Sequence, residues 1–193
     1  MPPKEMFTLE KVVDAAFSIL RKSGWPAVTA RAIAKALKSS TMPVYSAMGS
    51  MEALEAALKR KALVRLAEYQ ARPYTENEFL NLGVGQVRFA RDEPSLYRFL
   101  LLESPIPLSA HDQKELRGEV VRLLGRPFPV KTYFGGLQTG AFDAIALKGW
   151  IFTHGLAMGL MNGNLPPMDD ARLIELLSDA GLAFFESEKK KNP

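Results

Sequence analysis

The chain has no cysteine and only two histidines among its 193 residues. The absence of cysteine excludes disulfides and thiolate chemistry. His111 and His154 are too few and too far apart in the sequence to suggest a metal site. No serine, histidine and carboxylate have the spacing of a nucleophile, its base and an orienting group. We therefore expect no metal, no cofactor and no enzymatic activity.

Long apolar runs are also missing. The opening residues, MPPKEMFTLEKVV, lack the apolar centre of a secretory signal, and no later run approaches the roughly 20 residues that a membrane span requires. Hydrophobic residues still make up 47% of the chain, enough to bury a full core in one or two domains. We expect a soluble cytoplasmic protein without a membrane partner.

Positive charge is concentrated in the first third of the chain. Residues 1–60 hold nine Lys and Arg against five Asp and Glu, whereas residues 61–193 hold sixteen of each. This bias favours a polyanionic partner, because neutralised phosphates supply most of the non-specific affinity for DNA. The alternative is that these cations only solvate a small helical surface.

Residues 29–54, TARAIAKALKSSTMPVYSAMGSMEAL, have the pattern of two short helices joined by a turn. Thr29 can cap the first helix. Pro43 fits only in the first turn of the second helix, which places its start near Thr41. If this helix packs on the first, its opening residues point outward, as in a helix that enters a DNA major groove. A plain αα-hairpin in a helical core would show the same pattern.

Beyond residue 61 the apolar spacing is helical, with no strand pattern. Thr75 and Glu78 have the spacing of a capping box, which predicts a helix start. A short, almost wholly apolar helix is expected over residues 95–102 and an amphipathic one over 109–124. The Pro- and Gly-rich residues 127–139 form the longest connection and are the natural place for a mobile lid.

Two final helices are expected at residues 140–162 and 169–189. The first mixes many glycines and alanines with large apolar residues, and glycine within a helix costs up to about 1 kcal/mol relative to alanine. This composition suggests the close approach of another helix, so we expect the pair to form a homodimer interface. The alternative is an ordinary buried helix pair inside one subunit.

The N-terminal segment has six features in a fixed order. They are an amphipathic first helix, a glycine, a threonine-led helix with an Ile-Ala pair, a turn, a second short helix with a tyrosine, and a further helix after a polar linker. They correspond to residues 12–16, Gly24, Thr29 with Ile33 and Ala34, Ser40, Val44 with Tyr45, and residues 50–54. With these features the segment resembles the DNA-binding domain of the TetR family of transcriptional repressors.

Part of the second half resembles one subgroup of TetR-family C-terminal domains. Residues 150–157 carry its Trp…His-Gly pattern, and residues 94–98 match its Pro-Ser-Leu-Tyr-Arg stretch. The resemblance implies a domain for ligand binding and dimerisation. Aromatic side chains with a few hydrogen-bonding tips are typical of such a cavity, although each could equally belong to the core. The candidate ligand-binding residues are Phe89, Tyr97, Leu101, Tyr133, Trp150 and His154.

The recognition segment departs from the family pattern. Lys38 and Ser39 replace the common glycine and apolar residue at the turn, Met51 replaces the lysine that opens the fourth helix, and residues 39–51 carry no charge. Each missing cation should reduce the slope of log binding constant against log salt concentration by about one unit. The resemblance leaves the following residues as candidate DNA contacts: Thr29, Arg31, Lys38, Ser40, Thr41, Met42 and Tyr45.

The sequence thus predicts an all-α protein, with a three-helix helix-turn-helix domain at residues 1–50 and a larger effector-binding and dimerisation domain at 51–193. The resemblance implies a repressor whose affinity for a double-stranded DNA operator is lowered by an unknown small, largely apolar effector. The expected hinge is the fourth helix, over residues 50–72. The alternative is a helical small-molecule- or protein-binding dimer with weak or lost sequence-specific DNA binding.

Overall fold

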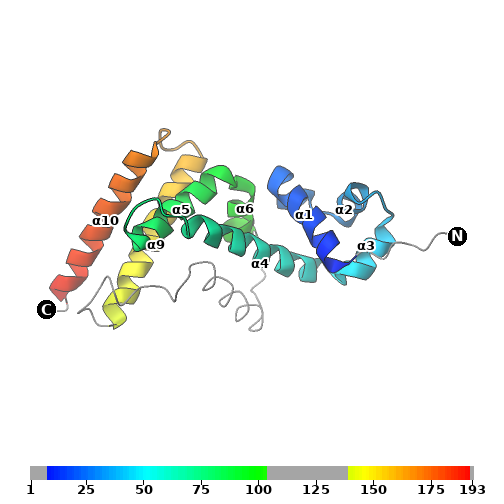
Figure 1. The fold of residues 1–193 in the computed structure, drawn as a ribbon, viewed down its shortest axis with the longest axis horizontal. Helices are drawn as coiled ribbons and strands as arrows, with labels where there is room; N and C mark the ends of the chain where they lie inside the picture. The colour runs from blue at the N-terminus through cyan, green and yellow to red at the C-terminus, as the bar shows by residue number, and fades with distance from the viewer. Residues whose placement is uncertain (1–7, 104–138, 192–193) are drawn as a thin grey trace. The chain divides into compact units, whose positions relative to one another are not determined.

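The computed structural model describes residues 8–103 and 139–191 of the chain (Figure 1). Every regular element in these ranges is helical, so the all-α prediction is confirmed there. The elements are α1 (Leu9–Ser23), the 3₁₀ turn η1 (Trp25–Ala27), α2 (Ala30–Ala36), α3 (Thr41–Met48), α4 (Met51–Gln70), α5 (Glu78–Asp92), α6 (Pro94–Arg98), the π-helical turn η2 (Phe99–Glu103), α9 (Thr139–Met161) and α10 (Asp170–Lys191). The helix predicted at 109–124, the connection up to residue 138, His111 and Tyr133 lie outside the described residues.

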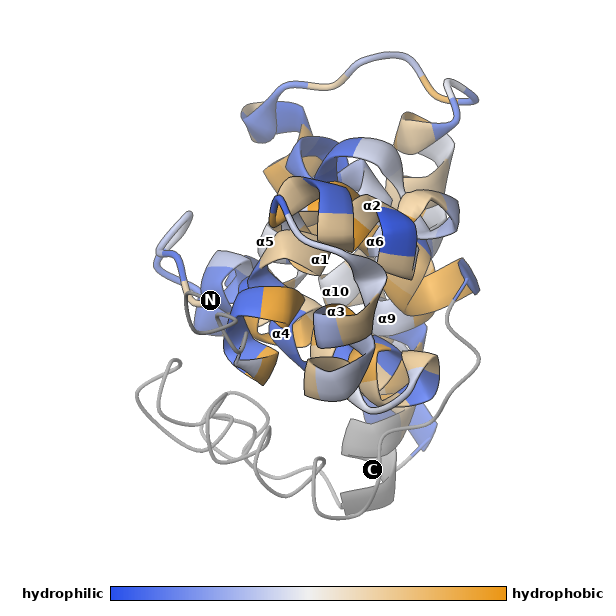
Figure 2. Ribbon diagram, turned by 90° about the vertical axis from the view of Figure 1, so that its right-hand side faces the viewer, coloured by the Kyte–Doolittle hydropathy of each residue, from blue (hydrophilic) through white to orange (hydrophobic). Residues whose placement is uncertain are grey.

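The chain divides into two compact units. The first comprises Met1–Arg65 and Glu93–Arg117, and the second Leu66–Asp92 and Gly118–Pro193. Helix α4 therefore starts in the first unit and ends in the second, and Figure 2 shows both hydrophilic and hydrophobic residues on it. The sequence predicts a boundary after residue 50, between a DNA-binding domain and an effector-binding domain. This division by function stays a prediction.

Local signals at the helix ends account for the first four helices. The hydroxyls of Thr8, Thr29 and Ser50 accept hydrogen bonds of 3.1–3.3 Å from backbone N–H groups three residues further on. Gly24 and Gly49 end α1 and α3 with φ angles of 79° and 74°, which glycine adopts without a steric penalty. The helix starts and stops expected in this region are confirmed.

The core of the first unit draws on segments far apart in the sequence. Helix α1 packs on α2 and α3, and α6 also packs on α1. The rings of Trp25 in η1 and Phe99 in η2 have centroids 5.1 Å apart. The most deeply buried side chains are Val12, Ala16, Leu20, Ile33, Val44, Leu54, Leu58, Leu96, Tyr97 and Phe99. The short buried helix expected at 95–102 is thus split into α6 and η2, and it completes the core behind the first three helices.

A buried carboxylate joins three parts of this unit. Glu93, which precedes α6, is only 5% exposed. Arg21 of α1 binds it with two nitrogens, Nε at 2.8 Å from Oε2 and Nη2 at 2.5 Å from Oε1. Nε of Arg65 in α4 lies 3.5 Å from the same Oε1. Because a buried carboxylate is stable only when it is paired, this cluster fixes α1 and α4 to the start of α6.

The start of α5 differs from the prediction. Asn77 is its cap, and Oδ1 of this residue accepts hydrogen bonds from the backbone N–H groups of Phe79 at 3.0 Å and Leu80 at 3.2 Å. Thr75 instead donates from Oγ1 to Oδ1 of the buried Asn81 at 2.9 Å. The capping-box prediction is wrong because α5 begins at Glu78, directly after Asn77, so Thr75 lies too early in the chain to cap it.

Helices α5, α9 and α10 pack against one another in the second unit (Figure 1). At Gly85, helix α5 approaches the end of α4 so closely that an added Cβ would lie 2.5 Å from the carbonyl oxygen of Tyr69. Arg88 of α5 forms an ion pair with Asp170 at the start of α10. Backbone approach at Gly85 and charge pairing at Arg88, about one turn later on the same helix, therefore set the position of α5.

Helix α9 corrects one expectation. Ala144–Met161 is long and apolar enough to cross a membrane by length and composition, with a mean hydropathy of 1.2, and 22% of it is buried. The expectation that no apolar run approaches the length of a membrane span is therefore wrong. Alanine and glycine between the large residues keep this segment apolar, and Lys148 is its one charge. A core helix passes the same test, so this is weak evidence for a span.

The final helix pair begins and ends close to the expected residues. It also packs within one chain, as the alternative interpretation required. Both helices nevertheless keep large apolar side chains exposed by 48–62%. These side chains belong to Leu147, Trp150, Ile151 and Leu182.

Glu188 near the end of α10 makes the second unit sensitive to acid. Hydrogen bonds from Lys148 of α9, at 2.5 Å, and from Lys191, at 2.9 Å, hold the pKa of this carboxyl below its ordinary value of 4.5. The lowered pKa adds stability that is present above about pH 4.5 and is lost as the pH falls through the folded-state pKa. Urea unfolding at pH 7 and pH 3 should therefore show a smaller acid-induced loss of stability in Glu188→Gln than in the parent. An equal loss in both proteins would contradict this assignment.

Candidate functional site

The turn between α2 and α3 holds a residue in a left-handed conformation. Lys38 has a φ of 52° and is the only residue other than glycine with positive φ in the described ranges. The N–H of Ser39 donates to the carbonyl of Ala34 at 2.9 Å, and that of Lys38 to Lys35 at 3.2 Å. These two bonds form a Schellman motif, whose left-handed position usually carries glycine. The structure therefore keeps at Lys38 the conformation for which the TetR pattern commonly has a glycine.

Helix α3 has one buried side and one exposed side. Val44 is fully buried and Met48 is 3% exposed, whereas Met42 is 71% and Tyr45 52% exposed. The two outward side chains stand on the first two turns of a helix that packs on α1 and α2. Such a rigidly held helix start can reach the base edges in a major groove.

All seven candidate DNA contacts lie in this part of the chain and are exposed. Thr29 uses its hydroxyl oxygen to accept the capping bond, which leaves the O–H able to donate to a phosphate. Lys35 is also exposed, one helical turn after Arg31. Sequence reasoning missed this lysine, and the i, i+4 spacing of the two cations could have revealed it.

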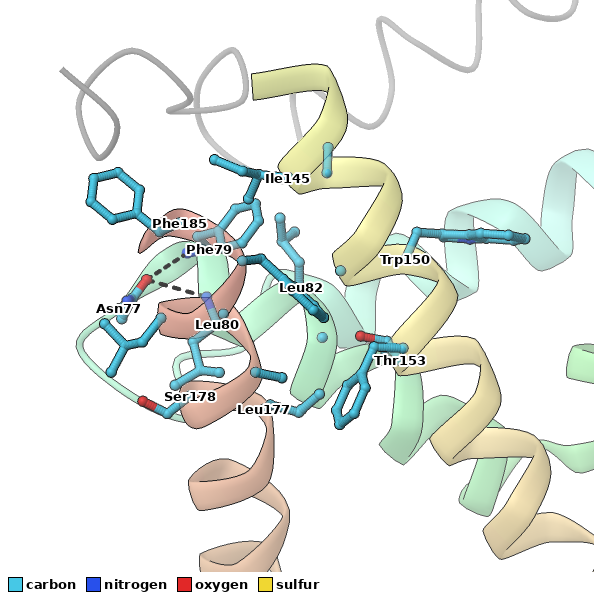
Figure 3. Close-up of a pocket in the computed structure, with 18 of the residues that line it drawn as sticks. Asn77, Phe79, Leu80, Leu82, Ile145, Trp150, Thr153, Leu177, Ser178 and Phe185 are labelled. Atoms are coloured by element: carbon cyan, nitrogen blue, oxygen red, sulfur yellow. Dashed lines mark hydrogen bonds between the residues drawn. The ribbon is translucent and has the colours of Figure 1, made fainter. Parts of the chain in front are cut away.

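A cavity of about 510 Å³ lies in the second unit (Figure 3). Helices α5, α9 and α10 form its walls, with contributions from the end of α4 and from the cap of α5. We call it the α5–α9–α10 cavity. Its lining residues are Gln70, Asn77, Phe79, Leu80, Leu82, Gly83, Gln86, Ile145, Ala146, Gly149, Trp150, Phe152, Thr153, Leu177, Ser178, Ala180, Gly181, Leu182, Phe184 and Phe185.

Comparisons with known proteins find a curated relative and several similar solved structures. No protein-family model matches the chain. The chain is 28% identical over 107 residues to an uncharacterized HTH-type transcriptional regulator, YobS, of Bacillus subtilis (strain 168), a match that spans 53% of this chain and 56% of that protein. A protein with unknown function from Rhodococcus sp. RHA1 has a TM-score of 0.67 at 21% identity, covering 97% of this chain and 98% of that one.

The second similar structure decides the fold. A TetR family transcription regulator from Marinobacter aquaeolei VT8 superposes with a TM-score of 0.65 at 15% identity, over 91% of this chain and 94% of that one. The chain has the TetR fold. The resemblance noted on the helix-turn-helix residues is thereby confirmed as a resemblance to a TetR-like regulator.

Of the candidate ligand residues that the structure describes, Trp150 alone lines the α5–α9–α10 cavity. Phe89 is fully buried against Tyr69, with ring centroids 5.5 Å apart. Tyr97 and Leu101 belong to the first unit. These roles in ligand binding remain untested predictions, and Tyr133 is not among the described residues.

His154 does not line the cavity, and its ring stacks on that of Trp150. Their ring centroids lie 5.3 Å apart and their planes differ by 1°. Trp150 is itself 48% exposed, and its ring points away from the labelled side chains of α5 and α10 in Figure 3. The tryptophan therefore belongs to the rim of the cavity, and the histidine supports the tryptophan ring.

Sequence reasoning missed most of the cavity wall. Leu177, Phe184 and Phe185 carry the helical apolar spacing expected of a dimer face, yet all three line the cavity. The sequence did not indicate Gln86 and Thr153 as cavity residues, because a single polar residue in an amphipathic helix does not by itself predict a binding site. Only the packing of α5 against α9 and α10 makes these residues neighbours.

Proposed function

We propose that this TetR-like protein is a cytoplasmic transcription regulator that represses by binding an operator as a homodimer, and that a small, largely apolar effector lowers its affinity for the operator. The observation that carries the proposal is the outward side of α3, with Met42 and Tyr45 exposed while Val44 and Met48 anchor the helix. The match to an HTH-type regulator over about half of each chain supports it.

The proposed homodimer interface covers the exposed apolar surface of α9 and α10, at residues 140–162 and 169–189. Ile151 is 56% and Leu182 62% exposed in the single chain, and removing apolar surface of this kind from water on dimerisation is favourable. An added Cβ at Gly155 would meet no atom within 4 Å, so the backbone of α9 is accessible there to a second copy. Small residues of this kind allow helices to approach closely.

The proposed mechanism is thermodynamic linkage between effector and operator. In one conformation of the dimer, the distance between the two recognition helices does not match the operator. An effector that binds this conformation more tightly lowers the affinity for the operator by the same free energy. Half-sites one DNA turn apart require the two recognition helices to lie roughly 34–36 Å apart. The effector must move the helices away from this distance. Helix α4 is the proposed hinge because it begins in one unit and ends in the other.

Fluorescence anisotropy tests the DNA-binding part of the proposal. The protein is titrated onto its own upstream intergenic DNA and onto a scrambled duplex, at two salt concentrations. A preference of about 10³ or more for the native DNA supports a specific regulator. Equal, weak, salt-sensitive binding to both duplexes contradicts autoregulation.

Two substitutions separate phosphate binding from base reading. Arg31→Gln should weaken binding to both duplexes and lower the salt slope by about one unit, because one phosphate contact is lost. Tyr45→Ala should cost about 1–3 kcal/mol on the native DNA and less on the scrambled duplex. Arg172→Gln is the control, since this residue is 58% exposed on α10, far along the chain from the helix-turn-helix, and forms an ion pair with its neighbour Glu175. Equal effects of all three variants would contradict the assignment.

The second candidate function is a ligand- or protein-binding dimer with weak or lost sequence-specific DNA binding. The absence of charge over residues 39–51, which includes the whole of α3, favours it. Unchanged promoter occupancy in an Arg31→Gln and Tyr45→Ala double variant would support this function over repression.

A further inference from the structure

We infer that the α5–α9–α10 cavity takes an electrically neutral, mostly apolar ligand with one hydrogen-bonding group, and that Gln86 and Thr153 bind this group. The biological meaning of such a ligand rests on the proposed effector function. Its binding does not depend on DNA and can be measured without it.

The size and apolar walls of the cavity suit a small organic molecule. Its volume of about 510 Å³ falls within the range of small-molecule sites, roughly 300–1,000 Å³. Aromatic rings from two facing helices contribute to the wall, and Phe152 and Phe184 meet edge to face with centroids 6.1 Å apart. Leu82 of α5 and Leu177 of α10 complete the apolar surface seen in Figure 3.

Two buried polar side chains interrupt this apolar wall. Gln86 on α5 is 7% exposed and Thr153 on α9 is 5% exposed, and both line the cavity. An amide and a hydroxyl can each donate and accept a hydrogen bond. A ligand with a hydroxyl, carbonyl or amide group can therefore bind here in a fixed orientation.

Among the described residues, the lining of the cavity contains no Asp, Glu, Lys, Arg or His. The N-terminus of α5 carries partial positive charge at this wall, and Oδ1 of Asn77 already occupies its N–H groups at Phe79 and Leu80. Burying an unpaired ion costs far more than burying a neutral polar group. The cavity should therefore select the neutral member of a series of otherwise identical molecules.

Three probes with the same chain and different head groups test the selection. They are decan-1-ol, decanoate at pH 8 and decylamine at pH 8, each below its aggregation limit. Trp25→Phe removes the tryptophan of the first unit, so Trp150 at the cavity rim alone reports binding by fluorescence. We expect saturable binding of the alcohol, at least about tenfold tighter than that of either ion. Binding of either ion as tight as that of the alcohol would overturn the inference.

A pair of leucine variants locates the probe. Gly149 lines the cavity, and an added Cβ there would meet no atom within 4 Å. Ser18 is exposed on α1, outside both the cavity lining and the proposed dimer interface. Leucine should raise helix propensity at both positions, so folding is preserved. Gly149→Leu should weaken decanol binding at least tenfold, and Ser18→Leu should leave it within twofold. Equal effects of the two variants would place the probe elsewhere and overturn the inference.

A third variant tests the polar contact. Thr153→Val keeps the shape of the side chain and removes its hydroxyl. It should weaken decanol several-fold and leave decane unchanged, because only the alcohol uses the hydroxyl. Saturable decanol binding in a protein without specific DNA binding would support this inference while contradicting the proposed repressor. Specific DNA binding without any binding of decanol would do the reverse.

Discussion

Gly85→Ala is expected to destabilise the protein by about 3 kcal/mol or more. The added methyl carbon would lie 2.5 Å from the carbonyl oxygen of Tyr69 and 2.6 Å from Cα of Gln70. These are backbone atoms of α4, so no side-chain rotation can relieve the clash. Helix α5 must shift as a whole, which disturbs its packing on α9 and α10. Urea unfolding followed by circular dichroism measures the loss.

Gly83→Ala is the matched control, two residues earlier in the same helix. Its added carbon would lie 3.5 Å from the side chains of Leu177 and Thr153, which is ordinary van der Waals contact. The higher helix propensity of alanine should leave the protein unchanged or more stable by up to about 1 kcal/mol. If both variants lose the same stability, helix propensity and flexibility rather than the backbone contact govern this helix.

Glu93→Gln should cost about 2–3 kcal/mol of folding stability. Glutamine has nearly the same shape as glutamate but lacks the charge that pairs with Arg21 and Arg65. The loss should stay below that of a fully buried pair, because the two arginines are 46% and 34% exposed and water can solvate them. The variant should also loosen α6 against α1, since the cluster lies where the chain re-enters the first unit.

A surface ion pair in the same unit provides the comparison. Lys61 of α4 binds Asp14 of α1, and the two side chains are 42% and 55% exposed. Asp14→Asn should change stability by less than about 1 kcal/mol, because water screens exposed pairs. Chemical denaturation of both variants measures the difference. A loss in Asp14→Asn that equals the loss in Glu93→Gln would mean that burial of Glu93 contributes nothing.

Residues with local effects made the helices of this chain predictable from sequence. Thr8, Thr29 and Ser50 cap helices through N–H groups three residues away, and Gly24 and Gly49 end helices by adopting positive φ. Such effects need no tertiary contact. The helix-turn-helix, with α3 starting at Thr41 and turning Met42 and Tyr45 outward, follows from the same kind of signal.

The cavity could not be predicted in this way, because its walls come from helices that are distant in sequence. Gln86 and Thr153 become neighbours of one space only when α5 packs on α9. The apolar residues of α10 gave an ambiguous signal, since helical spacing shows that a face is covered but not what covers it. The sequence places Phe184 and Phe185 on an expected dimer face, and the structure shows that both line the cavity.

The sequence by itself determined the all-helical class, the ends of the helices and the exposed recognition helix, because caps, proline, glycine and apolar spacing act within a few residues. Tertiary structure alone decided that Glu93 joins α1 to α4 and that Gly85 allows two backbones to meet. Each of these outcomes depends on a contact between segments whose distance in space is set by the packing of whole helices, and no local pattern encodes that distance.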